Sequence, residues 1–160
     1  MKIDPSRALL RHTVATLAYR AEKALRGAPP RFGDFVIAPG TRTPAQILAH
    51  MGDLFDWALW MAKGKHVWRD STPLEWDAEV ARFFSTVEAF DAHLESSAVL
   101  GSTVERLFQG PIADSLTHTG QLTMLRRLAG KPVKGENYAK ADIAAGAIGR
   151  AQAAPRVEFD

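Results

Sequence analysis

The sequence predicts an all-α protein built as a helix bundle. Four segments carry apolar residues at helical spacing, and stretches rich in glycine, proline or polar residues separate them. No stretch of four or more residues alternates between apolar and polar in the way of a half-buried strand. With 160 residues, 46% of them hydrophobic, the chain can bury one core. We therefore expect a single domain over residues 1–150 and a polar C-terminal tail over 151–160.

The first two predicted helices have clear boundaries. The first covers residues 6–26 and ends where Gly27 interrupts the apolar pattern. A loop rich in proline and glycine follows. Thr43 then supplies an N-cap, and Pro44 occupies the first turn of a second helix that runs to about residue 63.

The remaining helices follow after two loops. Apolar residues at helical spacing predict a third helix over 74–97 and a fourth over 111–128, which Gly130 and Pro132 close. The alanine-rich segment 138–148 predicts a shorter fifth helix. Four long amphipathic segments joined by loops favour a bundle.

The fourth predicted helix carries two polar groups within its apolar stripe. Asp114 and His118 stand four residues apart, so both project from nearly the same side, and Leu122, Leu125 and Ala129 continue that side. A buried polar group without a partner costs a few kcal/mol. A bound metal ion is one partner that would satisfy both side chains.

His50, on the apolar side of the second helix, offers a third ligand. A metal bound by His50, Asp114 and His118 would take two ligands from one helix and one from another, as metal sites in helix bundles do. Three protein ligands leave coordination positions open for water or substrate. The same pattern also fits a simple helical pair of Asp114 with His118 and a core histidine with other partners.

Other charged residues on these helices have simpler interpretations. Asp53 and Asp56 are expected to face solvent, and Arg126 and Arg127 near a helix C-terminus are explained by the helix dipole. The remaining histidines are expected to be solvated and outside the site: His12, His66 and His93.

Composition narrows the classes of function. Lysine and arginine number 20 against 18 aspartate and glutamate, and the net charge of +2 argues against nucleic acid as a partner. The absence of cysteine excludes disulfides, a thiolate nucleophile and sulfur ligands. No apolar run is long enough to span a membrane, so we expect a soluble, cytoplasmic protein.

Two motifs resemble those of the DinB/YfiT-like superfamily: TPAQILAHM around His50, and D-x-x-x-H-x-G-Q-x-x-x-L-R-R-x-x-G-x-P from Asp114 to Pro132. The resemblance implies an up-down-up-down four-helix bundle with a fifth helix, usually a homodimer, that holds nickel or zinc with three histidines. By motif, His50 and His118 match two of these ligands. The chain departs from the commonest pattern at Asp114, where the family usually has histidine, although a carboxylate can also ligate a divalent ion.

The resemblance implies enzymes that act on small molecules with a low-molecular-weight thiol. Members include S-transferases that use bacillithiol or a similar thiol, and a mycothiol-dependent maleylpyruvate isomerase. In such an enzyme the metal lowers the pKa of the cofactor's thiol, which suits a chain without cysteine. A metal that activates water for hydrolysis is the second possibility. The third is a non-catalytic, stress-associated binding protein that has lost competent metal binding through Asp114.

Overall fold

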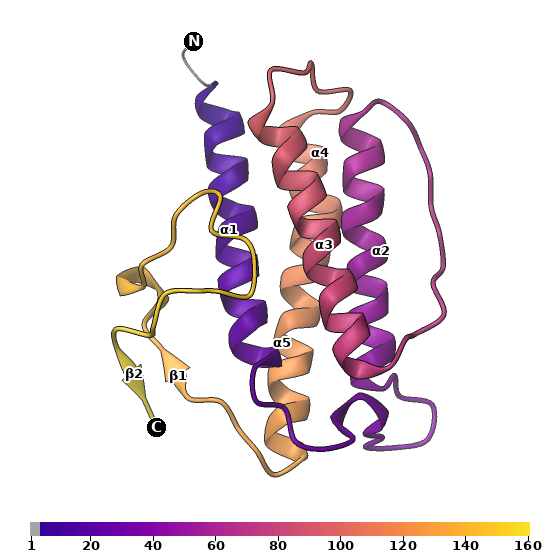
Figure 1. Cartoon of the computed structure of the whole chain (residues 1–160), viewed down its shortest axis with the longest axis vertical. Coiled ribbons are helices and arrows are strands. Elements are labelled where there is room, and N and C mark those ends of the chain that lie inside the picture. Colours follow the sequence, from indigo (N-terminus) through magenta and orange to yellow (C-terminus); the bar gives the residue numbers. More distant parts are fainter. Residues whose placement is uncertain (1–3) are drawn as a thin grey trace.

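The computed structural model describes residues 4–160 and is predominantly helical. The long helices lie side by side along the longest axis of the molecule (Figure 1). These are α1 (Pro5–Leu25), α2 (Pro44–Ala62), α3 (Trp76–Glu95) and α5 (Ala113–Leu128). The prediction of a mainly helical chain with four long helices is confirmed, and their ends lie within about two residues of the predicted ones.

Local hydrogen bonds explain where the second helix starts. The Thr43 hydroxyl accepts a hydrogen bond from the Gln46 amide at 3.2 Å, and the Gln46 side chain accepts one from the Thr43 amide at 2.8 Å. This is a capping box, and Pro44 occupies the first turn, where no amide donor is needed. The start of α2 is therefore fixed by residues that lie less than two turns before His50.

Two further helical segments lead directly into the helix that carries Asp114 and His118. The short helix α4 (Val104–Leu107) leads directly into a π-helical segment, Phe108–Ile112, and then into α5. Pro111 lies within the π-helical segment and has no amide hydrogen to donate. Regular α-helix therefore resumes at Ala113, immediately before Asp114.

The core lies between the four long helices and continues into the α4–π segment. Its phenylalanine side chains come mainly from α2 and α3, which pack along each other. Its largest fully buried apolar side chains are Leu17, Phe32, Leu48, Met51, Phe55, Phe83, Phe90, Leu94, Leu107, Ile112 and Leu122.

The predicted fifth helix is wrong. Residues 138–148 contain only a 3₁₀ turn, Tyr138–Lys140, followed by turns and irregular backbone that lie beside α1 (Figure 1). Gly146 has a positive φ of 87°, which no α-helix contains. Alanine favours a helix but offers little apolar surface to bury, so tertiary contacts decide the path of this segment.

The chain end is held by a small antiparallel sheet that the sequence did not predict. Strand β1 (Gly135–Glu136) pairs with β2 (Glu158–Phe159), which places part of the predicted tail against the fold. Lys23 of α1 donates to Glu136 at 2.7 Å and to Glu158 at 2.9 Å. Burial alone would lower the pKa of Lys23, but these two carboxylates raise it.

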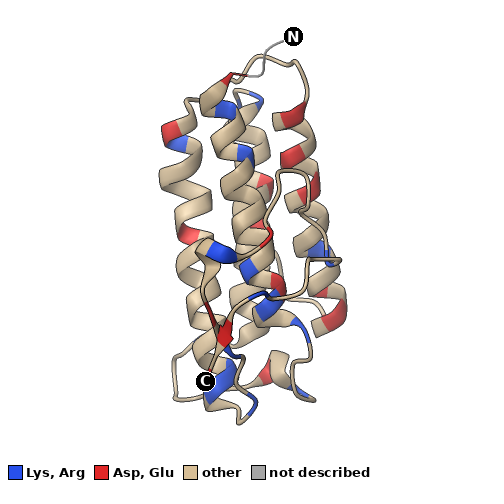
Figure 2. Ribbon diagram, turned by 90° about the vertical axis from the view of Figure 1, so that its left-hand side faces the viewer, with Lys and Arg blue, Asp and Glu red and all other residues tan. Residues whose placement is uncertain are grey.

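Charged side chains of both signs are spread over the helices and the C-terminal segment (Figure 2). Across residues 4–160, no helix is both long enough and apolar enough to cross a membrane.

Candidate metal centre

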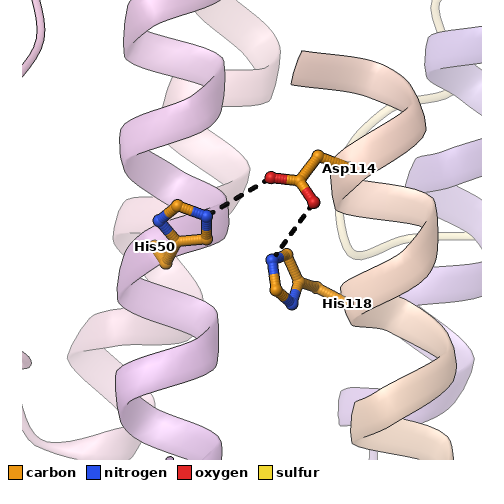
Figure 3. Close-up of side chains that lie close together, drawn as sticks. All are labelled: His50, Asp114 and His118. Carbon is orange, nitrogen blue, oxygen red and sulfur yellow. Dashed lines mark hydrogen bonds and ion pairs between the residues drawn. The ribbon is translucent and has the colours of Figure 1, made fainter. Parts of the chain in front are cut away.

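The structure brings together the three predicted ligands, His50 from α2 and Asp114 and His118 from α5 (Figure 3). All three are half-buried: the side chains of His50, Asp114 and His118 are 23%, 46% and 12% exposed. Asp114 lies between the two histidines and is the most exposed of the three. The cluster therefore lies at the edge of the bundle, where solvent and small molecules can reach it.

The carboxylate of Asp114 faces both imidazole rings. One oxygen, Oδ2, lies 3.4 Å from Nε2 of His50, and the other, Oδ1, lies 3.4 Å from Nε2 of His118 (Figure 3). The two rings are nearly perpendicular, with centroids 4.9 Å apart. One ligand atom from each residue can be chosen so that all three lie within 4.8 Å of one another.

This donor set fits a small divalent ion. Two ligand atoms about 2.1 Å from a tetrahedral ion are separated by about 3.4 Å. Each of the two 3.4 Å distances matches that separation, but they end on different oxygens of Asp114. For a single ion, the three ligand atoms, which lie within 4.8 Å of one another, would have to move closer together. Two imidazole nitrogens and a carboxylate oxygen suit zinc or nickel.

Gln121 orients the imidazole ring of His118. Its side-chain oxygen lies 2.7 Å from Nδ1 of His118, and with the amide in this orientation Nδ1 is the donor. In the neutral ring, Nε2 then presents its lone pair to the Asp114 carboxylate. Two acceptors that face each other can be bridged by a metal ion or by a water molecule that donates to both. Gln121 lies three residues after His118, so the helical spacing could have identified it.

A loop covers one side of the cluster. Residues 63–75 connect α2 to α3 and run along the outer side of α2 (Figure 1). Trp68 from this loop packs against His50 with ring centroids 5.7 Å apart. Trp68 also meets Trp57 edge to face at 6.0 Å and donates its indole hydrogen to Asp70. No periodic pattern marks Trp68, because it belongs to a loop.

Asp53 was expected to face solvent, and that prediction is wrong. The residue is 4% exposed and accepts hydrogen bonds from the amide and the hydroxyl of Ser71, at 2.9 and 2.6 Å. Arg82 of α3 bonds to the same carboxylate at 3.1 Å and to Glu79 at 2.6 Å. Burial alone would lower the pKa of Arg82, but the bonds to Glu79 and Asp53 raise it. This network anchors the loop that carries Trp68.

The other predicted side chains lie outside the cluster. His12 and His66 are exposed, as expected, whereas His93 is half-buried and lies 3.3 Å from the carbonyl oxygen of Ala62. Arg126 is 3% exposed and donates to carbonyl oxygens at the end of α1 and in the following turn. Desolvation lowers its pKa. Its role is structural rather than that of a surface charge at the helix end.

Two hollows border the cluster. One, of about 460 Å³, is lined by His118 together with apolar side chains of α5 and of the 37–47 region. The other, of about 420 Å³, is lined by Asp114, Trp57 and Thr117. Both are open to solvent, so a bound ion would have accessible coordination positions.

Comparison with known proteins adds no assignment: no family model, no curated protein and no solved structure matches this chain.

Proposed function

We propose that this chain is a DinB/YfiT-like four-helix bundle that binds a divalent metal ion through His50, Asp114 and His118. The observation that carries the proposal is the convergence of these three side chains, with both Asp114 oxygens 3.4 Å from an imidazole nitrogen. The ligands come from α2 and α5, the helices that bear the two family-like motifs. Zinc and nickel are the ions whose ligand preferences fit this set.

The proposed activity is that of a metal-dependent transferase or hydrolase acting on a small molecule. When bound, the ion would lower the pKa of a coordinated thiol or water and leave positions open for it. Since the chain has no cysteine, the nucleophile in a transferase would come from a low-molecular-weight thiol. In a hydrolase it would come from water.

The residues around the ligands have distinct tasks in this proposal. Gln121 holds the His118 ring so that Nε2 faces the site. Trp68 covers the His50 ring and excludes water from that side. The open hollow beside Asp114 gives a substrate access without any change in the helical core.

The test is elemental analysis of protein purified without a histidine tag or chelator. Wild-type protein should contain close to one equivalent of zinc or nickel per chain, and His50→Ala and His118→Ala should each lose it. His12→Ala is the matched control, because His12 is an exposed histidine on α1 and should leave the metal content unchanged. Circular dichroism of each variant verifies that its fold is intact.

Asp114→His offers a second comparison, because it restores the commoner family ligand. It should retain or increase the affinity for nickel. Wild-type protein that stays metal-free after incubation with zinc and nickel would exclude the metal-dependent enzyme. The bundle would then be better described as a non-catalytic binding protein.

A further inference from the structure

The hollow beside His118 is mainly apolar. It lies between α5 and the segment around residues 37–47, and its walls include Ile37, Ile47 and Leu125. Its volume of about 460 Å³ falls within the range typical of small-molecule sites. His118 and Gln121 line the same hollow, so it borders the candidate metal centre on the side of His118.

Several large apolar side chains of this hollow are unusually exposed. Ile37 is 48%, Met124 56% and Leu128 54% exposed. A single exposed apolar residue needs no explanation, but three around one concave surface are typical of a site that is covered by a ligand. The hollow therefore offers apolar surface whose burial would stabilise a complex.

One cation lies at this hollow without a partner. Within residues 4–160, the guanidinium of Arg42 makes no ion pair and no side-chain hydrogen bond, and none of the hollow's lining residues is acidic. Thr41 adds a hydroxyl beside it, already engaged with the Ala38 carbonyl. The only formal charge that is permanent in this hollow is thus positive, which favours an anionic group on the ligand.

We infer that this hollow binds a small amphipathic anion, with its apolar body against Met124 and Leu128 and its anionic group beside Arg42. The inference rests on the proposed function for the chemistry at His118 and adds the substrate class: an apolar molecule with a carboxylate or similar anionic group. Charge complementarity at Arg42 favours such a ligand over a second copy of the chain. A concave surface that ends at a candidate metal centre also suits a small molecule.

The experiment compares octanoate with octylamine, which has an equally long apolar chain and the opposite charge. Binding is followed by NMR chemical shifts on metal-free, chelator-treated protein, so that coordination of the carboxylate by a metal cannot contribute. Octanoate should bind about fivefold more tightly than octylamine, because one exposed charge pair contributes modestly. The shifts should map to residues of this hollow.

Three variants test the assignment. Leu128→Asp should weaken octanoate about tenfold by placing a charge in the apolar wall. Arg42→Glu should remove or reverse the preference for octanoate over octylamine. Val99→Asp is the control, because Val99 is 90% exposed and lies outside the hollow. It should leave both affinities unchanged.

Failure to bind octanoate, or equal binding of the two probes, would overturn the inference. A second result would also overturn it: octanoate does not bind, and sedimentation shows a dimer that Leu128→Asp dissociates. That result would assign the surface to contact with a second copy of the chain. Measuring the metal content of the same variants distinguishes a failure of this inference from a failure of the proposed metal site. Arg42→Glu should keep its metal, and metal-free protein should still bind octanoate.

Discussion

Replacement of Asp53 by alanine tests the buried network that anchors the loop over the candidate metal centre. The Asp53 side chain is 5% exposed and accepts three hydrogen bonds, two from Ser71 and one from Arg82, between 2.6 and 3.1 Å. Alanine would leave the Ser71 amide and hydroxyl, and one nitrogen of Arg82, without this acceptor. Glu79 would still bind the guanidinium, so the arginine would not be left entirely without a counter-charge.

The expected loss in the free energy of unfolding follows from the number and type of these hydrogen bonds. A hydrogen bond to a charged group contributes about 1.5–3 kcal/mol, and neighbouring bonds to one carboxylate are not additive. Because water can enter at the loop and Glu79 remains, we expect Asp53→Ala to lower the free energy of unfolding by about 3 kcal/mol. The same change should expose the loop to trypsin, which cleaves after Lys63, Lys65 and Arg69.

Asp56 provides a matched control one turn further along α2. Within residues 4–160 its only ion pair is with Arg69, at 2.8 Å, and the two side chains are 22% and 57% exposed. Asp56→Ala should cost less than about 1 kcal/mol. The assay is urea unfolding followed by circular dichroism, together with limited trypsin digestion. The assigned role of Asp53 would be refuted if Asp53→Ala and Asp56→Ala were equally stable. It would also be refuted if trypsin cut the 63–75 loop at the same rate in both variants.

Substitution of two further buried charges, Arg11 and Glu22, should change the stability of the fold in opposite directions. Arg11→Met should destabilise the fold by about 3 kcal/mol in urea unfolding, because it leaves Asp91 buried without its bidentate partner, whose nitrogens lie 2.9 and 2.8 Å from the carboxylate oxygens. The double variant with Asp91→Leu should recover most of that loss, and a double variant no better than the single would contradict this. Glu22→Gln should stabilise the protein, because desolvation raises the pKa of Glu22 and outweighs the opposing charges of Arg150, 3.7 Å away, and Arg26. A raised folded-state pKa means that the glutamate's contribution is most favourable below its unfolded pKa and is lost as the pH rises. The gain in melting temperature should therefore be small at pH 4 and grow towards pH 8, and a gain that shrank with rising pH would contradict the assignment.

The elements that the sequence predicts well are those that local patterns specify. Helix α2 is marked by the Thr43 cap, by Pro44 and by an apolar stripe, and these features also place His50 on the side towards the core. The spacing between Asp114 and His118 puts their side chains together by helical geometry alone. The approach of α2 to α5 is a tertiary feature, yet two half-buried stripes that carry polar residues are enough to suggest it.

The sequence-based predictions that proved wrong concern features determined by interactions between residues distant in the chain. Asp53 has the sequence context of a surface carboxylate, and only the path of the loop at Ser71 and the position of Arg82 on α3 make it a buried one. The 138–148 segment has the composition of a helix. It is instead held by contacts with α1, including the Arg20 guanidinium over the Tyr138 ring at 4.4 Å, which no pattern within the segment reveals.

The separation between stabilising residues and candidate ligands makes the metal proposal testable by mutation. The two ion pairs in which both side chains are at most 10% exposed, Arg11–Asp91 and Lys23–Glu136, join α1 to α3 and to β1. The candidate ligands lie half-buried on α2 and α5: His50, Asp114 and His118. A half-buried side chain removed from a bundle edge leaves little cavity and no fully buried orphan charge. Alanine variants of the ligands should therefore fold, so a loss of metal in them would report on coordination rather than on unfolding. Asp53→Ala should behave in the opposite way, with a clear loss of stability and the three ligands still present.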